Sequence, residues 1–357
     1  MKNILIVNEV CSDNIGDHAI NEGIRKALHE LSRCSVSVGF DAEKKHVKPK
    51  SLQEKNKSGL ISRIRHYILW KNQPVKYFRW YINNIRRIKK TLSGDYERII
   101  IGGGQLVQSG GTFPIAMYLW VRIAKKNNIP VYIVGVGCAE KFSTLDIWLY
   151  KKAFAKSHAI FVREKKSIEK LEVFFAVKSN YIPDLAYALY EAKGSQDFAK
   201  KNHVIVGATA FYVHKKNITE TGCVKEESFE RYVQYWEEII DREVQAGNLV
   251  ILVSTTVEDA ELNKYLYHRV DYINKDSCIE LVEMVPELSV YLDYLKRAKR
   301  VYSGRMHSLI LGHLNHCELA PALLSKKIEY YMQEYSVLDA LVLQQKVNET
   351  IAMDILK

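Results

Sequence analysis

The sequence lacks several features that would place the chain in a specialised class. None of its apolar runs approaches the roughly 20 residues of a membrane-spanning helix. The first run is short and is followed at once by acidic and polar residues, so we expect neither a membrane anchor nor a signal peptide. The six cysteines are scattered, with no C-x-x-C pair and no metal-ligand spacing. We therefore expect reduced thiols in a cytoplasmic protein, with no disulfide framework and no bound metal.

Acidic residues are missing from one long segment. Between Lys55 and Gly94 the chain has eleven Lys and Arg residues and no Asp or Glu, and this excess accounts for the net charge of +11. The remainder of the chain is balanced, whereas a protein that binds nucleic acid along much of its surface would spread its positive charge. We therefore expect no nucleic-acid partner.

Apolar residues alternate with cations in this basic segment, among them Tyr77, Phe78, Trp80 and Ile82. Helices of this composition are typical of segments that lie on an anionic membrane surface, here residues 55–94. Two other interpretations stay open. One is a solvated helical insertion, over about 44–94, whose aromatic residues pack on the first domain. The other is an RNA-binding segment, which the balanced charge elsewhere disfavours.

The chain as a whole has an ordinary globular composition, with 47% apolar residues. Short apolar runs alternate with longer amphipathic stretches, which predicts parallel β-sheets covered by helices on both faces. In chain order the runs are Asn3–Val7, Arg98–Ile101, Val131–Val136, Ala159–Val162, Tyr181–Ile182, Val204–Val206, Leu249–Val253, Ile279–Val282 and Arg300–Tyr302. A polar stretch at Glu191–Asn202 interrupts the pattern. We therefore predict an α/β protein with two Rossmann-like domains, residues 1–192 and 193–357, the last helix packing back on the first domain.

In such sheets the ligand lies beyond the carboxyl ends of the strands, so the residues at those ends are the candidates for function. The first such end carries Asn14 and Asp17 before a predicted helix, and the dinucleotide fingerprint G-x-G-x-x-G is absent there. Asn14 and Asp17 are suited to hydrogen-bond sugar hydroxyls, with Asp17 as a general base. Capping of the helix N-terminus is the alternative interpretation.

Three glycines and Gln105 form the second candidate site. Gly102, Gly103 and Gly104 follow the run Arg98–Ile101. Successive glycines let the backbone approach a ligand closely, and their amides can hold an anion. A tight turn between strand and helix explains the same residues equally well.

Arg163 is the third candidate, because it follows the predicted strand Ala159–Val162 directly. We expect its guanidinium to project into the ligand cleft, where it suits a carboxylate or a phosphate. A surface ion pair is the alternative. Glu164 and the two lysines after it are expected to form a solvated first turn of a helix.

The strongest local pattern is Ser303-Gly304-Arg305-Met306-His307-Ser308, which follows a strand and opens an apolar helix. A helix N-terminus carries partial positive charge and free amides, which favour an anion. Arg305, His307 and the Ser308 hydroxyl would complete a site for phosphate or carboxylate. His307 is the side chain best suited to exchange a proton near neutral pH.

The ordered set of strand-end motifs resembles the polysaccharide pyruvyl transferase family. The motifs are Asn14-Ile15-Gly16-Asp17, Gly102–Gly104, Gly135-Val136-Gly137, Val162-Arg163-Glu164 with Ser167, Pro183-Asp184 and Gly304–Ser308. The segment after the histidine helix keeps the family pattern only loosely, so Lys326 and Lys327 receive no assigned role. The basic segment has no counterpart in the family motifs.

The resemblance implies two Rossmann-like domains in a glycosyltransferase-B-like arrangement, the second domain carrying the donor site. It also implies phosphoenolpyruvate as donor and, as product, a pyruvate ketal across two hydroxyls of a sugar in a cell-surface glycan or its lipid-linked precursor. Arg163 and Arg305 would bind the two anionic groups of the donor. His307 would protonate the methylene carbon, and Asp17 would act as base. We expect no metal or redox cofactor.

Two other functions stay open at this point. A nucleotide-sugar-dependent glycosyltransferase of the same architecture would use the same cleft, with Arg305 and the helix end on a diphosphate. A non-catalytic, membrane-associated glycan-binding or assembly protein is the third possibility. In each case we expect a cytoplasmic protein, peripheral on the inner face of the membrane if the basic segment binds lipid.

Overall fold

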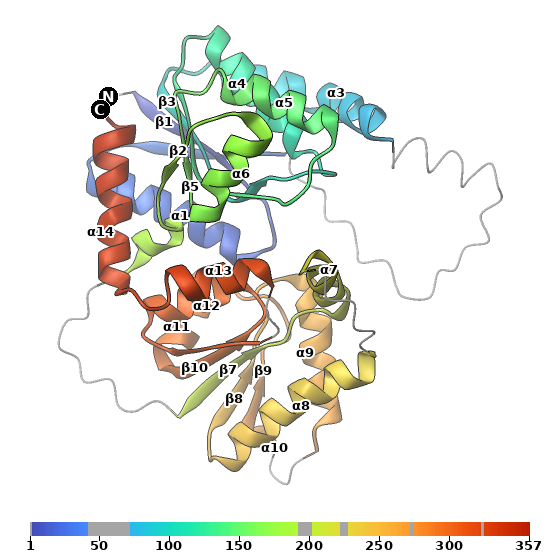
Figure 1. The fold of residues 1–357 in the computed structure, drawn as a ribbon. Helices are drawn as coiled ribbons and strands as arrows, with labels where there is room; N and C mark the ends of the chain where they lie inside the picture. The colour runs from blue at the N-terminus through green and yellow to red at the C-terminus, as the bar shows by residue number, and fades with distance from the viewer. Residues whose placement is uncertain (1, 42–71, 192–201, 222–227, 272–274, 323–324) are drawn as a thin grey trace, which may run out of the picture. The chain divides into compact units, whose positions relative to one another are not determined.

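The structure, a computed structural model, describes residues 2–41, 72–191, 202–221, 228–271, 275–322 and 325–357 (Figure 1). The chain divides into two compact units. Unit 1 comprises Met1–Cys11, Leu28–Asp184 and Ala352–Lys357, and unit 2 comprises Ser12–Ala27 and Leu185–Ile351. The division after Asp184 falls ahead of the boundary expected at 192. The first part of the basic segment, residues 55–71, lies outside the described residues.

Unit 1 contains a six-stranded parallel sheet in the order β2-β1-β3-β4-β5-β6. β4 shows why its sequence is so apolar, since every one of its eight residues is buried. A strand covered on both faces has no solvent-facing side to carry polar residues. The strands are β1 (Asn3–Asn8), β2 (Ser35–Gly39), β3 (Tyr96–Val107), β4 (Val131–Cys138), β5 (Ala159–Val162) and β6 (Asn180–Tyr181).

Four helices of unit 1 contribute to one apolar core with alternate residues of the strands. Figure 1 shows α3, α4 and α5 side by side on the same side of the sheet. The helices are α3 (Gln73–Thr91), α4 (Phe113–Lys126), α5 (Thr144–Phe154) and α6 (Lys165–Phe175). Another helix, α1 (Ile15–Glu30), crosses from unit 2 into unit 1.

Unit 2 contains a five-stranded parallel sheet in the order β11-β10-β7-β8-β9. β7, the first of these strands in the chain, is the central strand of the sheet. β8 and β9 follow on one side of it, and β10 and β11 follow on the other side. This is the strand order of the Rossmann fold. The strands are β7 (His203–Gly207), β8 (Leu249–Leu252), β9 (Ile279–Leu281), β10 (Ala298–Ser303) and β11 (Glu318–Pro321).

Helices α8 and α9 pack against β8 and β9, while α11 and α12 pack against β7 and β10. The predicted α/β class with two parallel-sheet domains is therefore confirmed. The helical elements of unit 2 are η2 (Leu185–Leu189), α7 (Phe211–Thr221), α8 (Phe229–Gln245), α9 (Val257–Arg269), α10 (Lys275–Cys278), α11 (Leu288–Arg297), α12 (Met306–Leu314), α13 (Lys326–Glu334) and α14 (Ala340–Thr350). A π-helical turn, η3 (Ile351–Ile355), follows α14. Among the helices of the described residues, none combines the length and the apolar character that a membrane span needs.

Helix α3 is the described part of the basic segment, and polar contacts hold it on unit 1. Asn72 caps its N-terminus by accepting from the Val75 amide at 3.3 Å. Trp80 donates to Asp41, and Arg87 donates to the Gly39 and Phe40 carbonyl oxygens at 2.8 and 3.0 Å. This part of the basic segment therefore packs on the first domain, as expected for a helical insertion, which was one of the three interpretations.

A buried carboxylate, Asp146, connects α3 to α5. It accepts hydrogen bonds from Tyr77, from Ser109 and, at 2.6 Å, from the Gln73 amide, and its side chain is fully shielded from solvent. Burial and the hydrogen bond to Asp146 raise the pKa of Tyr77, so its phenol remains a donor.

Replacement of Asp146 by Ala should lower the free energy of unfolding by about 3 kcal/mol, because the buried Tyr77 and the half-buried Gln73 and Ser109 would lose their acceptor. Urea denaturation of the full chain measures this. Asp95 provides the matched control, since its ion pair with Lys2 joins two exposed side chains. Asp95→Ala should change the unfolding free energy by about 1 kcal/mol or less. Equal effects of the two substitutions would contradict the role assigned to Asp146.

Candidate active site

The strand order of unit 2 reverses between its two central strands, β7 and β10. The chain leaves adjacent parallel strands in opposite directions at such a point, so the loops diverge and leave a crevice at the carboxyl edge. The loop after β7 is Ala208–Ala210, and the loop after β10 is Gly304-Arg305. The motif Ser303–Ser308 predicted from the sequence therefore lies where a Rossmann-like sheet binds its ligand.

Local contacts shape the loop after β10. The Ser303 hydroxyl accepts from the Arg305 amide at 3.1 Å, and a side chain at position 304 would meet the Thr209 hydroxyl. A Cβ built on Gly304 would lie 2.5 Å from Thr209 Oγ1 and 3.1 Å from the Ala322 oxygen, so the position requires glycine. Helix α12 starts immediately afterwards at Met306, and the first amides of a helix have no acceptor within it. They are available to an anion.

Arg305 is held in place by a carboxylate that the sequence did not single out. Its Nε and Nη2 donate to the two carboxylate oxygens of Asp259 at 2.7 and 2.8 Å, and Nη2 also donates to Thr256 at 3.1 Å. Asp259 is buried, and it accepts a further bond from the Ala210 amide at 2.8 Å. The fork geometry fixes the plane of the guanidinium.

Arg305 keeps its positive charge. Burial alone would lower its pKa, but the hydrogen bonds and charge of Asp259, with Glu258 nearby, raise it above the ordinary value. Its side chain is 25% exposed, whereas that of Asp259 is only 2% exposed. The cation is thus the part of this pair that a ligand can reach.

His307, in the first turn of α12, lies against the start of α1 within the same unit. A Cβ built on Gly16 would come within 2.2 to 2.7 Å of the imidazole Nδ1, Cγ and Cβ atoms. The Ile15 amide donates to the Thr255 oxygen at 3.0 Å, which attaches this end of α1 to the loop after β8. Gly16 therefore leaves the space that the His307 ring occupies.

The two polar residues predicted at the start of α1 have different positions. The Asn14 side chain accepts from the Gly16 amide at 3.0 Å, and its carbonyl accepts from the Asp17 amide at 3.0 Å, so it caps the helix. The capping interpretation thus describes Asn14. Asp17 is half-buried and directly follows the glycine that contacts His307.

Ser308 does not present its hydroxyl to the crevice. The residue is fully buried, and its Oγ shares a 2.5 Å hydrogen bond with the Tyr291 hydroxyl. Desolvation raises the pKa of Tyr291, so the phenol stays neutral inside the unit. The expectation of a substrate-binding Ser308 hydroxyl is not supported by this geometry, although its backbone amide belongs to the first turn of α12.

Thr209, in the loop after β7, was missed by the sequence interpretation. It is 2% exposed, and its Oγ1 has no hydrogen-bond partner among the described residues. An unpaired buried hydroxyl costs free energy unless a water or a ligand satisfies it. No local sequence signal marks this threonine, because its position next to Gly304 arises only from the pairing of β7 with β10.

In unit 1 the strand order reverses between β1 and β3, and the glycine motif lies there. β3 continues through the glycines to Val107, so the expected loop directly after Ile101 is wrong. Pairing with β4 extends the strand. Gly103 and Gly104 have φ angles of 81° and 77°, which favour glycine. The Gln105 side-chain oxygen is buried without a partner among the described residues.

Arg163 is buried and paired, contrary to the expectation of an open guanidinium or a surface ion pair. It donates to Asp184 at 2.8 Å and to Glu164 at 3.4 Å, and all three side chains are less than a tenth exposed. Glu164 also accepts from Ser167 at 2.9 Å, so the expected solvated first turn is wrong for this residue. Two carboxylates neutralise the single cation, and an anion would compete with both of them.

The comparisons with known proteins identify the family to which these motifs belong. A family model for polysaccharide pyruvyl transferase matches residues 14–320, which is most of the chain. The chain belongs to the polysaccharide pyruvyl transferase family. The match begins at Asn14 and ends within β11, so it includes both the cluster around Arg163 and the crevice of unit 2. Comparison with curated proteins finds no matching sequence.

Solved structures resemble this polysaccharide pyruvyl transferase family member in fold. The UDP co-structure of S. aureus MnaA matches with a TM-score of 0.50 and 10% identity, over 100% of this chain and 90% of that chain. A UDP-GlcNAc 2-epimerase from Methanocaldococcus jannaschii gives 0.51 and 10%, over 100% and 93%. An α,α-trehalose-phosphate synthase (UDP-forming) from Burkholderia vietnamiensis gives 0.50 and 9%, over 99% and 90%. The fold is therefore glycosyltransferase-B-like, as predicted, and the epimerase structures share it.

The contact between Gly16 and His307 predicts a non-additive pair of substitutions. Gly16→Ala should lower the free energy of unfolding by about 1 to 3 kcal/mol, because the new methyl group collides with the imidazole. In a His307→Ala background the same change should be neutral or stabilising, since the ring is gone and Ala favours helix more than Gly. Urea denaturation of the four proteins gives the coupling energy, and strict additivity would contradict the contact.

Proposed function

We propose that this transferase takes phosphoenolpyruvate as its donor and binds it at the carboxyl edge of unit 2. The observation that carries this proposal is the arrangement at the end of β10, where the Arg305 cation and the amides of α12 come together beside His307. Phosphoenolpyruvate has a phosphate and a carboxylate on one small carbon skeleton, so it needs cationic groups and free amides at short range.

Each part of this edge has a separate task in the proposal. The amides at the start of α12 receive the phosphate, and Arg305, oriented by Asp259, pairs with the second anionic group. Thr209 supplies a hydrogen bond to the donor from the opposite loop, which satisfies its buried hydroxyl. Gly103, Gly104 and Gln105 lie at the corresponding edge of the sheet of unit 1, and their role as substrate-binding residues stays a prediction. Arg163 receives no donor contact here, because its charge is already neutralised.

The reaction then proceeds by proton transfer and two additions. His307 donates a proton to the methylene carbon, and the electron pair of the double bond forms the new C–H bond. The adjacent carbon gains cationic character, and a sugar hydroxyl adds to it and loses its proton to Asp17. Asp17 returns its proton to the departing phosphate as the C–O bond breaks and the carbon regains cationic character. A second hydroxyl then adds to this carbon and gives its proton to His307, which closes the ketal and restores both residues. Positive charge develops beside bound carboxylate and phosphate groups, which stabilise it.

A cavity in unit 2 suits the sugar acceptor. Its volume is about 750 Å³, and its walls include Asp13, His18 and Glu22 at the start of α1, opposite Met284 and Pro286 after β9. Carboxylates and histidine hydrogen-bond hydroxyl groups, and apolar side chains pack against a sugar ring. Asp13 and His18 flank Gly16 in the chain, so the acceptor hydroxyls would lie close to His307. We propose that the acceptor belongs to a cell-surface glycan or its lipid-linked precursor.

The direct test uses labelled phosphoenolpyruvate with lipid-linked glycans and measures both released phosphate and label in the glycan. The full chain should release one phosphate for each pyruvyl group transferred. His307→Gln should lower turnover about 10²- to 10⁴-fold with a smaller effect on donor affinity, whereas Arg305→Ala should reduce both. His268→Gln, an exposed histidine on α9, is the matched control and should keep full activity.

Ligand-induced thermal stabilisation distinguishes the rival function. Phosphoenolpyruvate should raise the melting temperature of the full chain, and the increase should disappear in Arg305→Ala. Stabilisation by nucleotide sugars, together with no response to phosphoenolpyruvate, would replace the proposal with a glycosyltransferase reaction. Unchanged turnover in His307→Gln would exclude the proton-donor role.

Thr209→Val tests the donor hydrogen bond independently of the fold. Valine has the shape of threonine without the hydroxyl, so the unfolding free energy should stay the same or increase, because a buried unpaired group is removed. The affinity for phosphoenolpyruvate should fall about 10- to 100-fold, since a hydrogen bond to a charged group is lost. Calorimetric titration measures the affinity. Unchanged affinity would mean that Thr209 does not contact the donor.

A further inference from the structure

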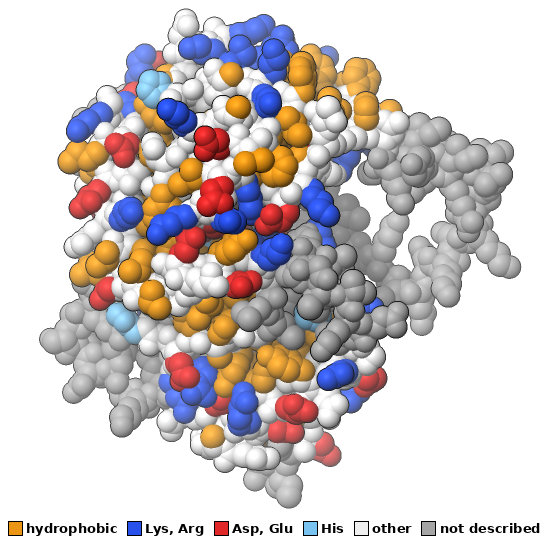
Figure 2. All heavy atoms as spheres, in the orientation of Figure 1, with side chains coloured by type: hydrophobic (Ala, Val, Ile, Leu, Met, Phe, Trp, Pro, Cys, Tyr) orange, Lys and Arg blue, Asp and Glu red, His pale blue; other side chains and the backbone are white. Residues whose placement is uncertain are grey.

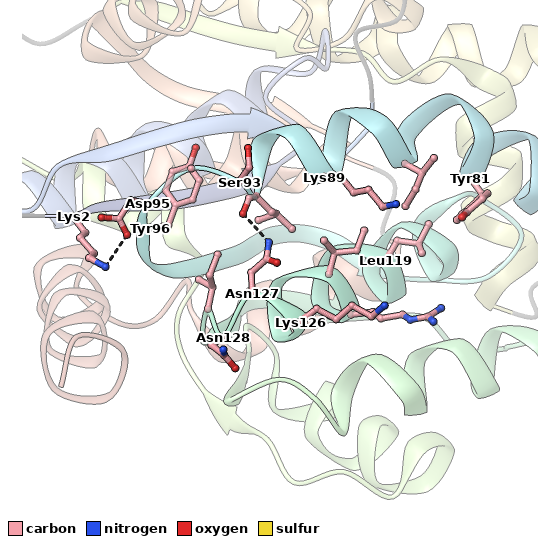
Figure 3. Close-up of a pocket in the computed structure, with 16 residues that line it drawn as sticks. Lys2, Tyr81, Lys89, Ser93, Asp95, Tyr96, Leu119, Lys126, Asn127 and Asn128 are labelled. Atoms are coloured by element: carbon pink, nitrogen blue, oxygen red, sulfur yellow. Dashed lines mark hydrogen bonds and ion pairs between the residues drawn. The ribbon is translucent and has the colours of Figure 1, made fainter.

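Unit 1 has a broad pocket between α3 and α4 that the transfer reaction does not use. Its volume is about 890 Å³, and its lining includes Tyr81, Ile85 and Lys89 from α3 and Arg122 and Lys126 from α4. Figure 3 shows Lys89 projecting from α3 and Lys126 lying along α4, both among the side chains that line the pocket. The acid that lines the pocket, Asp95, is already paired with Lys2 at 2.7 Å. The pocket therefore favours an anionic group.

An exposed apolar strip adjoins this pocket on α3. Phe78, Tyr81 and Ile82 are 63%, 40% and 54% exposed. Their spacing, with Ile85 one turn further on, places them on one face of the helix. This face is separate from the one that carries the buried Tyr77, Trp80, Asn84 and Ile88. Phe78 and Ile82 are thus not needed to hold α3 on the sheet, whereas Ile85 packs partly against the core.

Both helices carry basic and no acidic residues, and those of α4 lie in its C-terminal part. α3 contains six Lys and Arg residues and α4 contains three, and neither helix contains an Asp or a Glu. Figure 2 shows hydrophobic side chains gathered over α3 beside a group of Lys and Arg side chains over the adjoining α4. Apolar and cationic groups therefore occupy the same side of unit 1.

We propose that this surface docks on an anionic phospholipid bilayer. Phe78 and Ile82 enter the boundary between headgroups and acyl chains, and Tyr81 lies at the level of the headgroups. The phosphate of an anionic headgroup enters the pocket, where Lys89, Arg122 and Lys126 neutralise it. Docking would bring unit 1 to the surface that carries a lipid-linked glycan, but the proposal itself does not depend on the chemistry of transfer.

Charge and shape favour a bilayer over a nucleic acid for this surface. Single-stranded RNA is bound by stacking of its bases on aromatic rings, and it gains little from exposed isoleucine side chains. Here aromatic and aliphatic residues share one exposed strip, with cations beside it, which is the pattern of an interfacial helix. The polar network around Asp146 holds α3 on the unit, so the strip is presented by a fixed helix.

The test measures sedimentation of the full chain with vesicles of neutral phosphatidylcholine alone or with 30% phosphatidylglycerol added. Binding should require the anionic lipid and should weaken as salt increases. Each basic side chain close to an anionic surface contributes about fivefold in affinity. The triple variant Lys89→Gln, Arg122→Gln and Lys126→Gln should therefore bind about 100-fold more weakly.

Two further variants separate the components of the surface. Phe78→Ser with Ile82→Ser should lose vesicle binding at high salt while its melting temperature is unchanged, because both side chains are exposed.

The control Lys264→Gln, Lys296→Gln and Lys299→Gln removes the same charge from exposed positions of unit 2 and should bind like the original chain. Equal losses in control and pocket variants would overturn the proposal, as would binding of single-stranded RNA in preference to anionic vesicles. Phosphate release from phosphoenolpyruvate in detergent should be the same in all these variants, which separates failure here from failure of the proposed reaction.

Discussion

The bidentate ion pair between Asp259 and Arg305 is the interaction on which the active-site account depends. A long cationic side chain at the mouth of a crevice would otherwise sample many rotamers. Ligand binding would then be weakened by the conformational entropy lost when the side chain becomes ordered. Asp259 fixes it in advance, and Asp259 is itself fixed by the Ala210 amide. The pair connects α9 to the ends of the two central strands, so it orients the cation from a rigid part of the unit.

The family motifs form two clusters of contacts. In unit 2, Gly16 leaves room for the His307 ring, and Gly304 leaves room for Thr209. In unit 1, Arg163 pairs with Glu164 and Asp184, so motifs far apart in the chain meet in one buried network. A Cβ on Gly137 would lie 3.4 Å from Arg163 Nε, at the margin of what this network tolerates. Short, degenerate motifs are therefore specific as a set because their side chains contact one another.

Much of the fold could be predicted from the sequence because buried parallel strands are continuously apolar. The predicted strand Ala159–Val162 coincides with β5, and the other predicted runs overlap β-strands. β2 and β11 were missed because each is an edge strand. β2 has mostly half-exposed residues, and β11 begins with Glu318 and ends with Pro321. The glycine run was placed in a loop since glycine weakens a strand signal, whereas pairing with β4 extends β3 through it.

The chemistry of the site could be predicted only for residues that lie together in one sequence motif. Arg305 and His307 lie in a single turn, and their position before a helix indicated an anion site. Thr209 comes from the loop after β7 and Asp259 from the first turn of α9, so their roles depend on tertiary pairing that no local pattern reveals. The same reason explains the wrong expectation for Arg163: its partner Asp184 lies 21 residues along the chain.

The central claim is that the edge formed by Arg305 and α12 binds a small dianionic donor. Equilibrium dialysis of the full chain with labelled phosphoenolpyruvate tests it most directly. We predict one saturable site per chain, lost in Arg305→Ala and not displaced by UDP. Undiminished binding in that variant, or efficient displacement by UDP, would contradict the account.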